Sequence, residues 1–345
     1  MSVSDQQRSG NEGPLDPDTP ETVRLTVAEA TGIGARALEH LGYSGEAAGI
    51  ILDQLIDNAL CGYKFAGLPR ILAIAGNRKT HAQRHPIRIV NETPASALID
   101  GGNQVGYLAV YRGACVAIEK SKFCGLAAVG VYNSYYSGRN AYYLEKIARA
   151  GLVGLHVASA EPKVFPPGAA RGMLGTNPLG FGFPSSNGPV VFDMGTAALM
   201  GGERLLHALQ GRELPEGIAY DADGKPTRDP NAALSGGFAP FGGHKGYGLS
   251  FCVQALGLIA GAALTRGNVR DYGFLFFVIR PDIMLPGGDF ERQMAEYVRQ
   301  IKATPRQPGV DEIRIPSERS TRERERRRRE GIVIERSIVE KLKLV

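Results

Sequence analysis

The sequence predicts a mixed α/β protein, and three observations lead to that prediction. Apolar residues recur at helical spacing through residues 26–60. Beyond Pro69 they gather in short runs of the kind that strands use. Two later stretches, 289–302 and 320–344, again have the length and pattern of helices. With 345 residues, the chain is long enough for two or three domains around a substantial core.

The first predicted elements form a helical hairpin, whose two helices are separated by the turn 42–44 (Gly-Tyr-Ser). Inside the first helix, residues 32–37 (GIGARA) match the loose G-x-G-x-x-A pattern of a dinucleotide-binding turn. Such a turn follows a strand and precedes an acidic residue by about 20 positions in a βαβ unit. A helical pattern precedes residues 32–37 instead, so we expect no Rossmann turn here.

The middle of the chain alternates predicted strands and helices. A helix-like run over 108–120 overlaps one strand, and the tyrosine-rich stretch 132–143 leads into an amphipathic helix that ends near Gly151. The composition of 184–188 (PSSNG) predicts a turn between two strands. The predicted strands are 86–90, 106–110, 127–131, 154–158, two within 174–193, and 274–279.

The charge pattern bears on nucleic-acid binding as a function. The net charge is +5, and residues 319–330 contain seven Arg and three Glu. Because Glu318 with Arg322 and Glu325 with Arg329 stand four positions apart, the run is better explained as a salt-bridged helix than as a nucleic-acid surface. We therefore expect no nucleic-acid partner, and keep that function as the weakest hypothesis.

The uncharged stretch 246–265 is long enough to cross a bilayer as a helix. It contains Ser250 and Gln254 and lacks interfacial anchors at both ends, so we predict a core helix and no membrane partner. Residues 1–22 are polar and predict a disordered leader. The four cysteines form no C-x-x-C pair, which indicates no metal site and favours the cytoplasm.

Five short motifs follow one another in the second half of the chain. They are 173–181 (MLGTNPLGF), 191–194 (VFDM), 214–217 (LPEG), 242–246 (GGHKG) and 313–318 (IRIPSE). The fourth motif, GGHKG, offers glycine backbone N–H groups and the Lys245 ammonium at a predicted helix N-terminus, where a phosphate would bind. The alternative is a glycine turn with an exposed Lys, which has the same sequence pattern. In this order the motifs resemble the malate/L-lactate dehydrogenase-like family of NAD(P)-dependent oxidoreductases, which includes piperideine-2-carboxylate and diketogulonate reductases.

The resemblance implies an α/β fold whose nicotinamide-binding domain is not a Rossmann fold but is built around a largely antiparallel sheet. It implies a helical domain from both chain ends (23–70 with 303–345) beside a mixed α/β region that binds dinucleotide and substrate (71–302). It also implies a homodimer with a shared active site, a small-molecule substrate, and NAD or NADP as cofactor. The cofactor residues that it implies are Pro189, Val190, Val191, Phe192, Asp193, Met194, Gly195, His244, Lys245, Ser317, Glu318 and Arg319.

The expected catalytic residues depart from the family pattern. The family's substrate site begins Ser-His-Gly-x-x-Arg, and the matching stretch here is 62–70 (GYKFAGLPR). If the alignment is anchored on Leu68-Pro69, Tyr63 stands at the His position and Gly67 at the Arg position. A shift of one residue places Lys64 at the His position instead.

A second family His follows an Asn-Ser pair, and here residues 133–136 read Asn-Ser-Tyr-Tyr. We therefore expect tyrosine in place of both histidines, with Tyr63 and Tyr135 as candidate proton donors. The alternative is that these tyrosines pack at a domain boundary. Asp193 follows an apolar run and is expected to orient a catalytic group or the cofactor, with a turn-capping carboxylate as the alternative.

The first functional hypothesis is an oxidoreductase that moves a hydride between a nicotinamide and a small carbonyl, cyclic imine or hydroxy compound. The second is a protein that keeps the fold, has lost catalysis, and serves in binding or scaffolding. The sequence leaves open the substrate, the choice of NAD or NADP, the reaction direction, and whether the tyrosines re-tune catalysis or abolish it.

Overall fold

The computed structural model describes residues 21–264 and 272–345. Most of the predicted leader, residues 1–20, lies outside the described residues, as does Thr265 at the end of the uncharged stretch. Thr22 already belongs to a strand. No described helix is long and apolar enough to cross a membrane.

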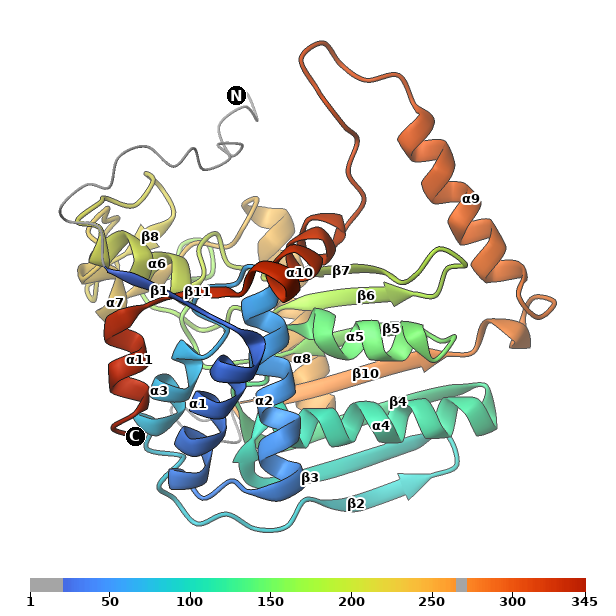
Figure 1. The fold of residues 1–345 in the computed structure, drawn as a ribbon, viewed down its shortest axis with the longest axis horizontal. Helices are drawn as coiled ribbons and strands as arrows, with labels where there is room; N and C mark the ends of the chain where they lie inside the picture. Colours follow the sequence, from blue (N-terminus) through green and yellow to red (C-terminus); the bar gives the residue numbers. More distant parts are fainter. Residues whose placement is uncertain (1–20, 265–271) are drawn as a thin grey trace.

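A seven-stranded sheet forms the centre of the molecule (Figure 1). Its strands are β2 (Arg88–Thr93), β3 (Ser96–Val105), β4 (Leu126–Tyr135), β5 (Val153–Ala158), β6 (Leu179–Phe183), β7 (Val190–Met194) and β10 (Gly273–Ile279). They stand in the order β2-β3-β4-β10-β5-β6-β7, and every pair is antiparallel except β3 with β4. The prediction of a largely antiparallel, non-Rossmann sheet is confirmed.

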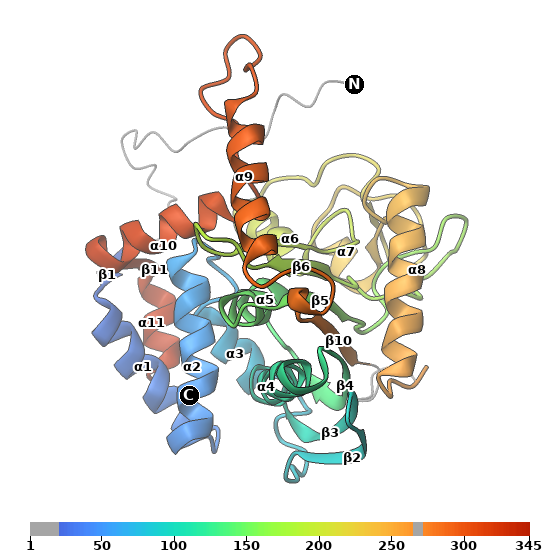
Figure 2. The ribbon, with the colours of Figure 1, turned by 90° about the vertical axis from the view of Figure 1, so that its right-hand side faces the viewer.

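Helices cover both faces of this sheet (Figure 2). On one face α4 (Gly106–Cys124) packs on β3, β4 and β10, and α5 (Asn140–Arg149) packs on β5, β6 and β7. On the other face α8 (His244–Ile259) packs on β10 and β5. The apolar strand β10 is therefore buried between helices, as its continuous run of apolar residues predicts.

The two ends of the described chain meet in a helical unit beside the sheet. β1 (Thr22–Leu25) pairs antiparallel with β11 (Ile332–Glu335), and around this pair lie α1, α2, α3 and α11 (Figure 1). A capping box between Thr26 and Glu29 begins α1. The bounds of the four helices are Val27–His40, Gly45–Leu60, Pro69–Ala75 and Arg336–Leu342.

Residues 32–37 lie inside α1, so the G-x-G-x-x-A pattern is part of a helix, as expected. Two predictions of secondary structure were wrong. Residues 106–110 begin α4 and are not a strand, and the strand before them, β3, was missed because it contains Asp100-Gly101-Gly102-Asn103. The helix predicted over 320–344 is α10 (Glu318–Glu330), then β11, then α11, because Gly331 takes a φ of 91° that ends α10.

The remaining elements lie outside the central layers. α9 (Asp289–Ala303) projects from the body, and none of its residues is buried (Figures 1 and 2). A two-stranded sheet of β8 and β9 contacts the short helix α7, and α6 is a second short helix of this part of the chain. Their bounds are Ala219–Tyr220, Gly237–Phe238, Ala232–Ser235 and Gly201–Leu209.

Candidate active site

The stretch Pro189 to Gly195, the first predicted cofactor segment, is edge strand β7 and its flanks. Near the strand's end Asp193 accepts a hydrogen bond from the backbone N–H of Ala141, 2.9 Å away in the first turn of α5. Burial raises the pKa of Asp193, against this hydrogen bond and the positive charge of Arg139. The carboxylate is thus fixed at a helix N-terminus and close to a guanidinium.

The second predicted segment, Ser317 to Arg319, lies against the first. The Ser317 hydroxyl donates a hydrogen bond to the backbone carbonyl of Val191, and Ser317 precedes α10 with a left-handed φ of 69°. Glu318 accepts a hydrogen bond from the backbone N–H of Ile315, which fixes the chain ahead of the helix. Two segments more than 100 positions apart are therefore joined at β7.

The third segment, His244 and Lys245, forms the first turn of α8 and is exposed. The loop before it pairs with the chain just after β7, because the Phe241 N–H donates to the Thr196 carbonyl over 2.8 Å. Gly246 is required here, since a Cβ would lie 1.7 Å from the Phe241 carbonyl oxygen. The structure thus brings all three predicted cofactor segments to the end or edge of one strand.

Tyr63 lies between Arg139 and Arg319, the last residue of the second segment. Tyr63 is 37% exposed, and the guanidinium carbons of Arg139 and Arg319 lie 4.7 and 5.5 Å from the centroid of its ring. It therefore faces a predicted cofactor residue. Lys64 does not join it, because that side chain lines a shallow depression with Leu68 and Ile332.

Tyr135 is placed elsewhere, and the expectation that it donates a proton to substrate is corrected. Its side chain is wholly buried, and its hydroxyl shares a hydrogen bond of 2.8 Å with the Thr80 hydroxyl. Burial also raises its pKa. A tyrosine with no exposed surface cannot contact a substrate, so Tyr135 is a core residue.

The next residue, Tyr136, points to a different group of side chains. It is partly exposed, takes a φ of 52°, and its ring centroid lies 5.3 Å from the guanidinium carbon of Arg70 in α3. Burial raises the pKa of the Tyr107 hydroxyl, and the charges of Arg70 and Arg139 oppose that rise. Two cations therefore approach the same buried phenol.

Sequence analysis did not single out Tyr136. If the family motif is anchored on Gly67, the run Gly67-Leu68-Pro69-Arg70 matches Gly-x-x-Arg without a gap. The packing of Gly67 supports this anchor, since a Cβ there would lie 2.9 Å from Ala59 Cβ. In that alignment Phe65 and Ala66 stand in place of Ser-His.

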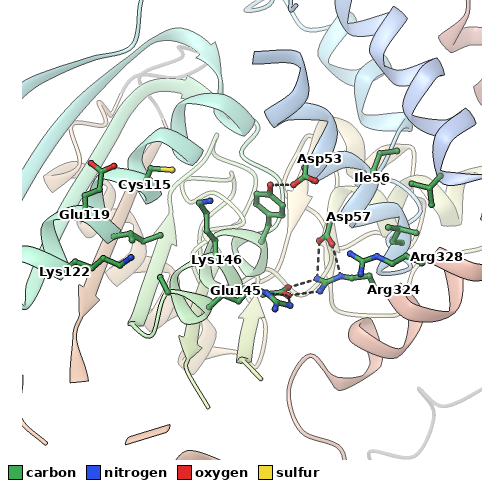
Figure 3. Close-up of a pocket in the computed structure, with 16 residues that line it drawn as sticks. Asp53, Ile56, Asp57, Cys115, Glu119, Lys122, Glu145, Lys146, Arg324 and Arg328 are labelled. Atoms are coloured by element: carbon green, nitrogen blue, oxygen red, sulfur yellow. Dashed lines mark hydrogen bonds and ion pairs between the residues drawn. The ribbon is translucent and has the colours of Figure 1, made fainter. Parts of the chain in front are cut away.

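An ionic network fixes Arg139, and three of its members, Asp57, Glu145 and Arg324, are seen in Figure 3. Asp57 of α2 accepts contacts from Arg139 at 2.7 Å and from Arg324 of α10 at 2.8 Å. Arg324 also binds Glu145 of α5 at 2.6 Å. Burial alone would raise the pKa of Glu145, but hydrogen bonds from Arg324 and its other arginine partner hold it at about 2. The network therefore ties the helical unit, α10 and α5 together.

Comparison with known proteins agrees with this geometry. The model of the malate/L-lactate dehydrogenase family matches residues 25–343. The chain belongs to this family. A malate/(S)-sulfolactate dehydrogenase from Methanothermus fervidus is 34% identical, over 92% of this chain and 96% of the relative. A Delta(1)-pyrroline-2-carboxylate reductase from Ancylobacter novellus is 33% identical, over 91% and 95%.

Solved structures show the same fold. The sulfolactate dehydrogenase from Methanocaldococcus jannaschii superposes with a TM-score of 0.82 at 30% identity, covering 93% of this chain and 96% of that one. A dehydrogenase from Sinorhizobium meliloti gives a TM-score of 0.86 at 27% identity, covering 94% and 98%. The protein is an enzyme of the dehydrogenase and reductase class.

Proposed function

We propose that the protein is an NAD(P)-dependent oxidoreductase that acts on a small carboxylate bearing a carbonyl, hydroxyl or cyclic imine group. The observation that carries this proposal is the meeting of three separate segments at β7, with Tyr63 between Arg139 and Arg319 beside them. A bound nicotinamide would supply or accept the hydride. The protein's own groups would bind and orient the cofactor and the substrate, and one of them would transfer the proton.

The residues along β7 fit a dinucleotide. The first turn of α8 offers exposed N–H groups, the ammonium of Lys245 and no acidic residue, which together suit a phosphate. Ser317 to Arg319 would hold the cofactor on the other side of β7, and Asp193 would orient it or a catalytic group. We leave NAD and NADP as equal candidates, because nothing in these contacts selects a 2′-phosphate.

Arg70 is the group that we assign to the substrate's acid. The names of the relatives include malate, sulfolactate and pyrroline-2-carboxylate, each of which contains an acid group. A guanidinium held against a tyrosine ring can grip a carboxylate through two parallel hydrogen bonds. Tyr63, with Tyr136 second, is the proposed proton donor, because both are accessible and Tyr135 is not.

We also propose that the enzyme is a homodimer in a reducing compartment such as the cytoplasm. α9 presents a half-buried apolar stripe of Phe290, Met294, Val298 and Ile301, spaced for one helix face. An isolated helix of 15 residues is marginal in water, so packing against a second copy would stabilise it. The four cysteines are free, which suits a reducing environment. Sedimentation of the wild type against Met294→Glu tests the dimer.

The deciding experiment is a titration with NADH and NADPH, followed by the nicotinamide's own fluorescence, and then turnover with 2-oxo acids and with cyclic imine carboxylates. Arg70→Gln should raise the KM of the preferred acid about 10- to 100-fold, the size of a lost charge-assisted pair. Arg78→Gln, an exposed arginine nearby, is the control. Failure of both nucleotides to bind at millimolar concentration would refute the oxidoreductase and leave a binding or scaffolding protein.

A further inference from the structure

We propose that Asn58 is a positioning residue of the active site, because it holds Arg139 and the loop 63–66 in a fixed relation to each other. Asn58 lies near the end of α2 and is wholly buried. It has no exposed surface with which to touch a substrate or a cofactor, so it acts through its neighbours. This role rests on the proposed function, in which Tyr63 donates the proton.

Asn58 is hydrogen-bonded to both ends of the loop. Its backbone carbonyl accepts from the Tyr63 N–H over 3.0 Å, and its side-chain Nδ2 donates to the Ala66 carbonyl over 3.0 Å. The chain leaves α2 through Gly62, whose left-handed φ of 88° turns the loop back towards the helix. A single residue of α2 therefore fixes both the point where the loop begins and the point where it ends.

The same amide group holds Arg139. Its Oδ1 accepts a hydrogen bond from Arg139 Nε at 2.5 Å, and Asp57 accepts one from Nη2 at 2.7 Å. These two nitrogens form one edge of the guanidinium, whose carbon lies 4.7 Å from the centre of the Tyr63 ring. A guanidinium held along one edge cannot turn away from that ring without breaking both bonds.

A buried amide is expensive unless its donor and its acceptor are both paired. Both atoms of Asn58 are paired, with two segments that lie far apart in the sequence. Gln54, one turn earlier in α2 and also wholly buried, donates to the Ser137 carbonyl in the turn before Arg139. The buried polar side chains of α2 therefore join the loop 63–66 to the turn 137–139.

The contact that Asn58 fixes is the one on which the proposed proton transfer depends. As Tyr63 gives up its proton, negative charge develops on its oxygen, and a guanidinium already in place beside the ring stabilises that charge. Without the Asn58 side chain, Arg139 keeps its bond to Asp57 but loses the second point that fixes its orientation. A displacement of about 1 Å in an active site can cost about 100-fold in rate.

Hydrogen exchange of the full-length protein without nucleotide tests the hydrogen bonds of Asn58 on their own. The Tyr63 amide should exchange about tenfold faster in Asn58→Leu, because the loop loses its second attachment. Asn58→Asp keeps an acceptor for Arg139 but no donor for Ala66, so it should show the same increase, and it serves if the Leu variant does not fold. Ser121→Ala, which removes a wholly buried and hydrogen-bonded hydroxyl from α4, is the control. Unchanged exchange in both Asn58 variants would overturn the proposal.

A double-mutant cycle tests the positioning role itself. Asn58→Leu should lower kcat about 10- to 100-fold and leave the Kd of the nucleotide unchanged, since Asn58 contacts none of the three predicted cofactor segments. In a Tyr63→Phe background the same change should lower kcat less than about threefold, because Asn58 acts through Tyr63. Ser121→Ala should keep the wild-type kcat.

Equal losses of kcat in the two backgrounds would show that Asn58 is a structural residue only. A near-native rate in Tyr63→Phe would remove the proposed proton donor and this role with it. Failure of both nucleotides to bind would refute the oxidoreductase, and the faster exchange of the Tyr63 amide would then show a structural attachment without a catalytic consequence.

Discussion

His156 should make the enzyme lose stability in mild acid, and the size of the loss follows from the structure. The side chain lies in β5 with no exposed surface, stacked on Phe276 at 3.9 Å between ring centroids. Its Nδ1 lies 3.0 Å from the Leu275 carbonyl oxygen. Burial lowers the pKa of His156 to about 3, although that hydrogen bond opposes the shift.

The direction of the effect follows from which state binds the proton. Below pH 6.5 the unfolded chain protonates His156, whereas the folded chain keeps it neutral down to about pH 3. The stabilisation is thus complete above pH 6.5 and is lost as the pH falls towards 3. Each pH unit costs about 1.4 kcal/mol, so the free energy of unfolding should fall by roughly 2.5 kcal/mol between pH 6.5 and 4.5 from this group alone.

Urea unfolding at a series of pH values measures how the free energy of unfolding changes with pH in the wild type, His156→Leu and His156→Gln. Both variants should be less stable at neutral pH, because they lose a stacked and hydrogen-bonded ring, but they should lose about 2.5 kcal/mol less on acidification. His40→Gln, an exposed histidine of α1, should titrate like the wild type. Carboxylates contribute equally to all four proteins. The same pH slope in wild type and both His156 variants would show that His156 is not buried in the neutral form.

Four further outcomes are expected. Lys245→Ala should weaken nucleotide binding by about 1.5 to 3 kcal/mol in a fluorescence titration, and unchanged affinity would remove Lys245 from the site. Gly34→Ala should lower the free energy of unfolding by about 1 to 3 kcal/mol in urea, because its Cβ would lie 2.6 Å from a leucine side chain. Gly32→Ala, whose Cβ would lie 3.7 Å from its nearest atom, should raise that free energy by up to about 1 kcal/mol. A loss of nucleotide affinity in either variant would mean that residues 32–37 form a Rossmann turn. Tyr63→Phe should slow turnover by about 10² to 10⁴, with a wild-type rate that is nearly flat from about pH 6 to 8, and a near-native rate would make Tyr63 a packing residue. Arg324→Met should lower the free energy of unfolding by about 3 to 5 kcal/mol, since it leaves two partly buried carboxylates short of a partner, and a loss below about 1 kcal/mol would mean that solvent screens the network.

The sequence predicted those features that depend on local pattern or on motif order. The hairpin of α1 and α2, the buried strand β10 and the order of the five motifs were readable, and the motifs led to the correct family and sheet type. The break between α10 and α11 was not, because a short strand after Gly331 gains its partner, β1, from about 300 positions away. No local window contains that partner.

The site was harder to predict than the fold because single positions decide it. Tyr135 and Tyr136 are adjacent, but Tyr135 ends β4 and faces the core, whereas Tyr136 follows the strand with a left-handed φ of 52° and faces Arg70. Sequence alone does not say which of the two faces the core. Which residue takes the family's Arg position depends on whether the motif is anchored on Leu68-Pro69, which gives Gly67, or on Gly67, which gives Arg70.

The pairing of β1 with β11 has a consequence for synthesis in the cell. Residues 22–25 are made about 300 positions before 332–335, the strand with which they pair. At about 5 to 20 residues per second, the first hairpin waits many seconds with part of its apolar surface exposed. Contacts between such distant residues also slow folding. The nascent helical unit therefore exposes apolar surface, to which a chaperone can bind, until β11 has been made.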